Sequence, residues 1–186
     1  MPKTELPPSE ALYPEPVVLV TCSDTKTKKT NIITIAWCGV VCSNPPLISI
    51  SVRPSRYSHR LIQEAGEFVI NIPSKAMASK VDLCGIRSGR DMDKVKECAF
   101  TLVPSSKIAT PMIQECPFNI ECRLEQTLSL GSHDMFIGKV VAVHADNAIM
   151  TPDGRIDYTK AAPIVYNQGE YWLLGSKIGS YGWSAK

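Results

Sequence analysis

The sequence predicts a mainly β protein, a Greek-key-like antiparallel barrel that carries a few inserted helices. At least eight short runs rich in Val and Ile are separated by polar turn segments. Helical patterns are inserted mostly after the third and fourth of these runs. This spacing, together with connections of hairpin length, favours a barrel over a doubly wound parallel sheet.

The composition is that of one ordinary soluble domain. The chain has 186 residues, of which 44% are hydrophobic and 20% are charged. Residues 1–16 hold five prolines and predict an extended N-terminal arm before a single domain at 17–186. A net charge of +2 gives no broad basic field, and no apolar run approaches the roughly 18 residues of a membrane span. We therefore expect no nucleic-acid or membrane partner.

The seven cysteines are an odd number and include no C-x-x-C pair. This pattern is typical of reduced thiols and predicts a cytoplasmic protein. Cys38 and Cys42 lie four residues apart, but no histidine stands in a recognisable ligand pairing with them. We therefore expect no metal site.

The first three strands are predicted at 17–22, 31–37 and 47–52. The polar segment 24–31 has the length and composition of a hairpin turn between the first two. In the third strand, apolar residues alternate with Ser49, Ser51 and Arg53. Successive side chains of a strand point to opposite faces, so one face of this strand is polar.

Helices and a further strand follow. A helix is predicted at 55–66, with Ser55 as its N-terminal cap and Gly66 at its end. The run 68–72 predicts a strand, 75–86 a second helix, and 91–98 a short helical turn.

The C-terminal half predicts antiparallel strands. In the run 118–125, Asn119, Glu121, Arg123 and Glu125 are expected to face water. The run 135–145 predicts a long strand kinked or bulged at Gly138, and 164–166 with 171–174 predict a hairpin. The aromatic tail 177–186 is interpreted as a segment that crosses to a partner.

A strand that delivers an arginine to a helix start is the most informative local pattern. Ser51 and Arg53 lie at the end of the strand, and Ser55 and Ser58 lie at the start of the helix. Free N–H groups of a helix start and a planar guanidinium suit a phosphate monoester. A capped helix whose arginine pairs with a nearby carboxylate is the alternative interpretation.

Other chemical motifs are absent or ambiguous. The chain has no G-x-G-x-x-G after a strand, no G-x-x-x-x-G-K-[ST] and no G-x-S-x-G. Glu121 and Glu125 are interpreted as part of a solvated face. His133 precedes Asp134 at a turn and could donate a hydrogen bond or move a proton, or it could be an ordinary turn histidine. His144 is interpreted as a hydrogen-bonded core or interface residue.

Two ordered blocks carry a family resemblance, NIITIAWCGVVCSNPPLISISVRPSRYSHRLIQEAGEFVINIP and GSHDMFIGKVVAV. The chain resembles the flavin reductase-like, FMN-binding split-barrel family, and within it the flavoredoxin branch. The likeness runs from about residue 16 to 179. It includes a T-x-A strand, an R-x-S-R helix start, an F-V-I-N strand and a G-[DS]-H block in the family's order.

The resemblance implies a homodimer of split barrels, each binding one FMN near the subunit interface. It implies that the backbone of Thr34, Ile35, Ala36 and Trp37 follows the isoalloxazine ring, that Ser51, Arg53, Ser55 and Ser58 hold the ribityl phosphate, and that Ser88, Gly89 and Lys94 belong to a segment closing over the flavin. His133 is implied to lie on the nicotinamide side of the flavin. Ser132 stands where the family more often has Asp, a departure that bears on nicotinamide use.

Three functions remain open at this point. The first is an NAD(P)H-dependent flavin reductase that uses bound FMN, with NADH or NADPH as co-substrate. The second is a flavoredoxin-type electron carrier that exchanges electrons with a protein donor or acceptor. The third is a ligand-binding module that has the barrel without the flavin.

Overall fold

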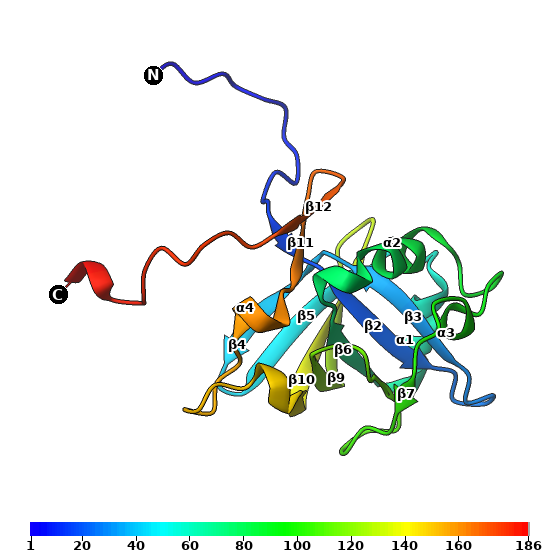
Figure 1. Ribbon diagram of the computed structural model, residues 1–186. Helices are drawn as coiled ribbons and strands as arrows, with labels where there is room; N and C mark the ends of the chain where they lie inside the picture. The colour runs from blue at the N-terminus through cyan, green and yellow to red at the C-terminus, as the bar shows by residue number, and fades with distance from the viewer. Residues whose placement is uncertain (186) are drawn as a thin grey trace.

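The computed structural model describes residues 1–185, and Figure 1 shows a strand-rich body flanked by short helices. The mainly β fold predicted from the sequence is confirmed. The twelve strands are β1 Glu15–Pro16, β2 Val18–Ser23, β3 Thr30–Ile35, β4 Cys38–Ser43, β5 Pro46–Val52, β6 Glu67–Ile72, β7 Leu102–Val103, β8 Met112–Ile113, β9 Phe118–Ser129, β10 Asp134–Ala145, β11 Ile164–Asn167 and β12 Glu170–Leu173. The helices are α1 Tyr57–Ala65, α2 Ala78–Ile86, α3 Lys94–Glu97 and α4 Tyr158–Ala161, with 3₁₀ turns at Lys75–Met77, Asn147–Ile149 and Trp183–Ala185.

Seven strands form one antiparallel sheet in the order β3-β2-β6-β9-β10-β5-β4. The sheet curls until the chain leaving β3 reaches β5, where the N–H of Ser51 donates to the carbonyl of Trp37 at 2.8 Å. Large apolar side chains, including Phe68 and Phe136, fill the interior with no exposed surface. The sheet is therefore a barrel with a packed core, closed only in part along one seam.

The helices cover the outside of the barrel near β2 and β3. α1 packs on β2, β6 and β3, and α2 packs on β3 and β2. The predicted C-terminal signal of α1 is confirmed, because Gly66 adopts φ 66° and its N–H donates to the carbonyl of Ile62. The predicted cap is wrong: α1 begins after Arg56, without a side-chain cap, because the segment before it forms a turn in which the N–H of Arg56 donates to the carbonyl of Arg53.

The predicted irregularity at Gly138 is confirmed. The register of β10 against β9 shifts between Ile137 and Gly138, and again between Val140 and Ala142. A Cβ at Gly138 would lie 2.6 Å from Cζ of Phe68 and 2.9 Å from Cβ of Cys122. Glycine is therefore required here, because the strand passes directly over core side chains.

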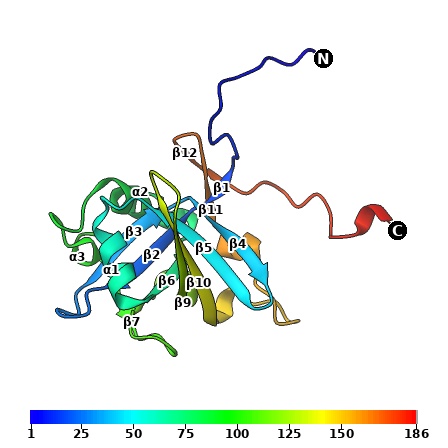
Figure 2. The same cartoon turned by 180° about the vertical axis from the view of Figure 1, so that it is seen from behind.

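A small second sheet, β1-β11-β12, stands beside the barrel. The predicted C-terminal hairpin is confirmed by the pairing of β11 with β12. Figures 1 and 2 show the N-terminal arm and the C-terminal tail both leaving the body next to this small sheet. Lys186, the end of the predicted partner-crossing tail, lies outside the described residues.

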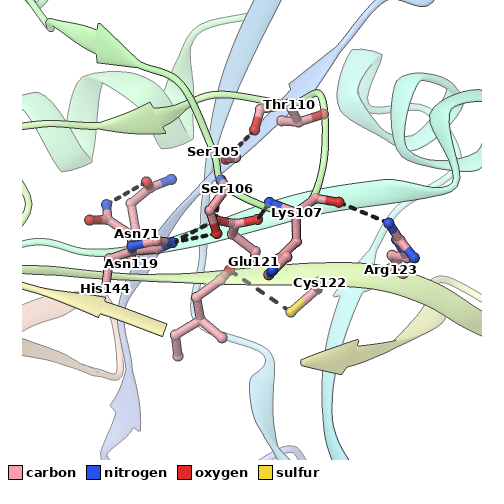
Figure 3. Close-up of polar contacts among 11 residues, drawn as sticks. Asn71, Ser105, Ser106, Lys107, Thr110, Asn119, Glu121, Cys122, Arg123 and His144 are labelled. Atoms are coloured by element: carbon pink, nitrogen blue, oxygen red, sulfur yellow. Dashed lines mark hydrogen bonds and ion pairs between the residues drawn. The ribbon is translucent and has the colours of Figure 1, made fainter. Parts of the chain in front are cut away.

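The prediction that four side chains of β9 face water is wrong for two of them, Asn119 and Glu121. Glu121 has no exposed surface because the segment 104–111 lies over it, and Asn119 is 7% exposed, with its side-chain amide donating to the carbonyl of Ile113 in β8 at 3.0 Å. The Glu121 carboxylate accepts hydrogen bonds from the N–H groups of Ser106 at 2.7 Å and Lys107 at 2.8 Å (Figure 3). His144, predicted to be hydrogen-bonded, lies with Nε2 2.6 Å from the same carboxylate.

A second carboxylate anchors the far end of the same segment. The N–H groups of Ala109 and Thr110 donate to Oε1 of Glu67 at 2.9 and 2.7 Å.

The hydrogen bonds to Glu121 also determine its ionisation. Burial by itself would raise the pKa of Glu121, but the hydrogen bonds from Ser106, His144 and Lys107 outweigh it and lower that pKa to about 2. The segment 104–111 is therefore held to the barrel by backbone donors and two strand carboxylates.

Candidate functional site

Two adjoining clefts lie where the open seam of the barrel meets α1 and α2. The first, here the strand cleft, has a volume of about 390 Å³. Its walls are the end of β3 with the residues that follow it, the end of β5, part of α2 and the β11–β12 hairpin. It is lined by Val17, Ile33, Thr34, Ile35, Ala36, Trp37, Ser51, Val52, Arg53, Arg56, Asp82, Gly85, Ile86, His133, Tyr166, Gly169 and Tyr171.

The second, here the basic cleft, has a volume of about 340 Å³ and continues from the first. The two clefts share Ile33, Arg53, Arg56 and Gly85. No Asp or Glu lines the basic cleft, whereas five cationic side chains do. Its lining is Asn31, Ile33, Arg53, Ser55, Arg56, Tyr57, Ser58, Cys84, Gly85, Arg87, Ser88, Gly89, Arg90 and Lys94.

The arginines of the basic cleft have no carboxylate partner within ion-pair distance in residues 1–185. The alternative in which Arg53 pairs with a neighbouring carboxylate is therefore wrong for the described chain. Arg90 is held in place differently, since its guanidinium donates to the carbonyl of Ser55 at 3.2 Å and lies 5.6 Å from the ring centre of Tyr57. Guanidinium groups without a carboxylate partner give a cleft the charge and hydrogen-bond donors that suit an anion.

Lys94 is the buried cation of this cleft, with 4% of its surface exposed. Its ammonium donates to the carbonyls of Ile32 at 2.8 Å and Cys84 at 2.7 Å. Burial lowers the pKa of Lys94, because a charged ammonium loses hydration there. An ammonium has three N–H donors, so one remains for an acceptor in the cleft.

The turn around Gly89 packs closely on the start of α1. The side-chain amide of Asn31 donates to Oγ of Ser58 at 2.7 Å, and a Cβ at Gly89 would collide with the Asn31 amide oxygen and the Tyr57 ring. Ser88 shapes the turn by accepting from the N–H of Arg90 at 3.2 Å. β3, α1 and this turn therefore form one interlocked wall of the basic cleft.

His133 lies in the strand cleft beside an aromatic wall. Its ring is nearly parallel to Trp37, at an interplanar angle of 5° and a centroid separation of 6.4 Å, and its Nδ1 lies 2.9 Å from Oγ of Ser132. Burial, followed by the positive charges of Arg53 and Arg56, lowers the pKa of His133. The imidazole is therefore neutral near pH 7 and suited to hydrogen bonding instead of charge pairing.

Every residue proposed from the sequence lines one of these two clefts. Thr34, Ile35, Ala36, Trp37, Ser51 and His133 line the strand cleft, Ser55, Ser58, Ser88, Gly89 and Lys94 line the basic cleft, and Arg53 lines both. Their contacts with a ligand stay predictions. Sequence reasoning missed Arg56, Arg87 and Arg90, although the R-x-S-R-x-x-x-R spacing of the family block and the R-S-G-R run offered a signal of clustered positive charge.

In residues 1–185, no group of three or more His, Cys, Asp or Glu side chains could hold a metal ion. None of the helices in that range has the length and apolar character needed to cross a membrane.

The fold and the paired clefts define a flavin reductase-like protein. The model of the flavin reductase like domain matches residues 10–174, so the chain belongs to this family. A flavoredoxin of Desulfovibrio vulgaris (Miyazaki F) is 33% identical, with a TM-score of 0.93 over 99% of this chain and 100% of that one. A flavoredoxin from Methanosarcina acetivorans is 29% identical, with a TM-score of 0.91 over the whole of both chains.

A protein with a split barrel domain from Shewanella frigidimarina NCIMB 400 supports the architecture alone. It is 21% identical, with a TM-score of 0.82 over 91% of this chain and 87% of that one. The barrel described above is therefore the split barrel of the flavin reductases.

Proposed function

We propose that the protein is an FMN-dependent oxidoreductase that accepts reducing equivalents from NADH or NADPH. The observation that carries the proposal is the adjacency of the two clefts: one has aromatic and backbone walls, and the other has five cations and no carboxylate. FMN is a planar ring joined by a ribityl chain to a phosphate, so its two ends match the two clefts. The FMN ring, when bound, supplies the redox chemistry by taking up and passing on electrons or a hydride.

The basic cleft is assigned to the phosphate. Arg53 and Arg56 lie where the clefts meet and offer planar donor forks, and Lys94 offers a buried ammonium. Ser55 and Ser58 add hydroxyls beside the start of α1. These groups bind and orient the phosphate, and their positive charge also favours the anionic form of a reduced ring nearby.

The strand cleft is assigned to the ring. The backbone of residues 34–37 forms one wall, and His133 and Trp37 form an aromatic edge. As a neutral imidazole, His133 would orient the donor by a hydrogen bond to its carboxamide. We expect His133→Ala to slow flavin reduction by NAD(P)H while leaving reduction by a protein donor nearly unchanged.

A second function, a flavoredoxin-type electron carrier, is favoured by one observation. The likeness to two flavoredoxins covers essentially the whole chain, and Ser132 stands where the family more often has Asp in the block that contains His133. In this reading a reduced protein, instead of a nicotinamide, supplies the electrons.

Anaerobic stopped-flow spectroscopy separates the two functions. FMN-loaded protein is mixed with NADH, with NADPH, or with a reduced ferredoxin-type protein, and the oxidised flavin band is followed. Rapid bleaching by a nicotinamide supports the reductase, whereas bleaching only by the protein donor supports the carrier. A purified protein that is colourless and gains no flavin absorbance on reconstitution refutes both and leaves a non-redox module.

We also propose that the protein works as a homodimer. In support, the edge strand β4 exposes Val40 and Val41, and β12 with the residue that follows it exposes Trp172, Leu173 and Leu174. Runs of exposed apolar residues are typical of an interaction surface. Light scattering behind size exclusion is expected to give twice the chain mass, and Val40→Lys to shift it toward the monomer. A wild-type monomer at micromolar concentration contradicts the proposal.

A further inference from the structure

A buried imidazole and a partly exposed carboxylate form a pair that joins α1 to β10. His59 lies in the first turn of α1 and is 8% exposed, and its Nε2 is 2.7 Å from Oδ2 of Asp134 at the start of β10. The hydrogen bond from His59 is the main cause that lowers the pKa of Asp134, so this carboxyl is ionised at neutral pH. An ionised carboxylate only accepts hydrogen bonds, so Nε2 of His59 carries the proton and donates it. Neither residue lines either cleft.

This pair links α1 to β10. The body of α1 packs on β2, β6 and β3, whereas His59 reaches across to β10. Its ring also meets Phe136 edge-on, with the centroids 5.0 Å apart and the planes at 61°. Residues two apart on a strand share a face, so His59 rests on one face of β10 through both Asp134 and Phe136.

Each member of the pair is the chain neighbour of a cleft residue. Ser58, just before His59, lines the basic cleft, and His133, just before Asp134, lines the strand cleft. Asp134 is also paired in register with Val52, next to Arg53. One side-chain hydrogen bond therefore links the chain segment beside Ser58 in the basic cleft to the chain segment beside His133 in the strand cleft.

We propose that His59 and Asp134 are positioning residues that fix the separation of the two clefts, so that a single FMN engages both at once. This inference rests on the proposed function, because it assigns the two ends of FMN to the two clefts. The pair does not touch the ligand. The pair therefore affects the affinity only of a ligand that occupies both clefts. Riboflavin, which lacks the phosphate, is the matched ligand that occupies the strand cleft alone.

The test compares the dissociation constants of FMN and riboflavin by flavin fluorescence titration of the apo protein. We expect His59→Leu to weaken FMN about tenfold and to change riboflavin less than twofold. His59→Gln keeps an N–H donor that can reach the carboxylate, and it is expected to stay within twofold of wild type for both ligands. Glu64→Gln on the same helix removes the exposed ion pair with Arg60 and is the matched control without effect on either ligand.

The ratio of the two constants separates positioning from general stability. Equal weakening of FMN and riboflavin by His59→Leu, or no weakening of FMN, overturns the inference. If His59→Leu fails to fold, Asp134→Ala breaks the pair from its partly exposed end and carries the same expectation. A wild-type protein that binds neither flavin overturns the proposed function and this inference with it, whereas normal FMN binding with an unchanged ratio in the variants overturns this inference alone.

Discussion

Replacing Arg53 by alanine is the sharpest test of the anion site. Arg53 lines both clefts and has no carboxylate partner in the described chain, so its removal should leave few internal contacts broken. A hydrogen bond to a charged group contributes about 1.5–3 kcal/mol net. Because Arg53 is an exposed side chain, we use the lower part of that range, about 1.5–2 kcal/mol. At about 1.36 kcal/mol per tenfold change, FMN affinity should fall roughly 10- to 30-fold.

The assay is a fluorescence titration of apo protein with FMN, repeated with riboflavin and at two salt concentrations. Riboflavin affinity should change little, because it offers no phosphate to Arg53. Arg155→Ala is the control variant, since Arg155 is exposed, pairs with Asp153 and lines neither cleft. Unchanged FMN affinity in Arg53→Ala, or an equal loss for riboflavin, would refute the assignment of the basic cleft to the phosphate.

Three further predictions concern the scaffold. Gly89→Ala should weaken FMN binding several-fold, measured by the same titration, because the new Cβ displaces Asn31 from Ser58; an unchanged affinity contradicts the interlocked wall. Gly138→Ala should lower the free energy of unfolding by about 1–3 kcal/mol in urea, because the Cβ meets Phe68 and Cys122. Gly39→Ala, where no atom lies within 4 Å of the new Cβ, should be nearly neutral, and equal effects at the two glycines would be inconsistent with the packing argument. Glu121 has a folded-state pKa of about 2, below its usual 4.5, so the stability that it contributes is present above pH 4.5 and is lost as the pH falls toward 2. That loss, about 3 kcal/mol, should be missing from the urea unfolding of Glu121→Gln over the same pH range, and parallel acid profiles would argue against it.

Local patterns were sufficient for most of the barrel. Period-two alternation of apolar residues placed the inward face of β5, runs rich in Val and Ile marked β2 and β3, and a glycine in a long apolar run marked the bulge at Gly138. β4 was missed because it is an edge strand whose Val40 and Val41 face outward, so its pattern carries no burial signal. Edge strands depend on a pairing partner more than on their own hydrophobicity.

Features that depend on distant segments could not be predicted in this way. Alternation placed Glu121 on the outer face of β9, but only the fold brings the segment 104–111 over that face. In the same way, His59 and Asp134 are 75 residues apart, and no local pattern relates them. The site residues on β3, β5 and the start of α1 were predicted because they lie in one continuous motif, whereas the arginines Arg56, Arg87 and Arg90 were missed because only the fold shows that they line the same cleft without a carboxylate partner.

The attachment of the segment 104–111 has a consequence for how this stretch can vary. Glu67 and Glu121 recognise main-chain donors at residues 106, 107, 109 and 110, and every amino acid except proline supplies such a donor. The side chains of Lys107 and Ala109, which are exposed, are therefore only loosely constrained. Ser106 and Thr110 are more constrained, because their hydroxyls donate to the same carboxylates at 2.9 and 3.0 Å. The two glutamates and the absence of proline at the four positions are constrained as well. Substitutions can therefore change the exposed side chains of this segment while its backbone path across the barrel stays the same.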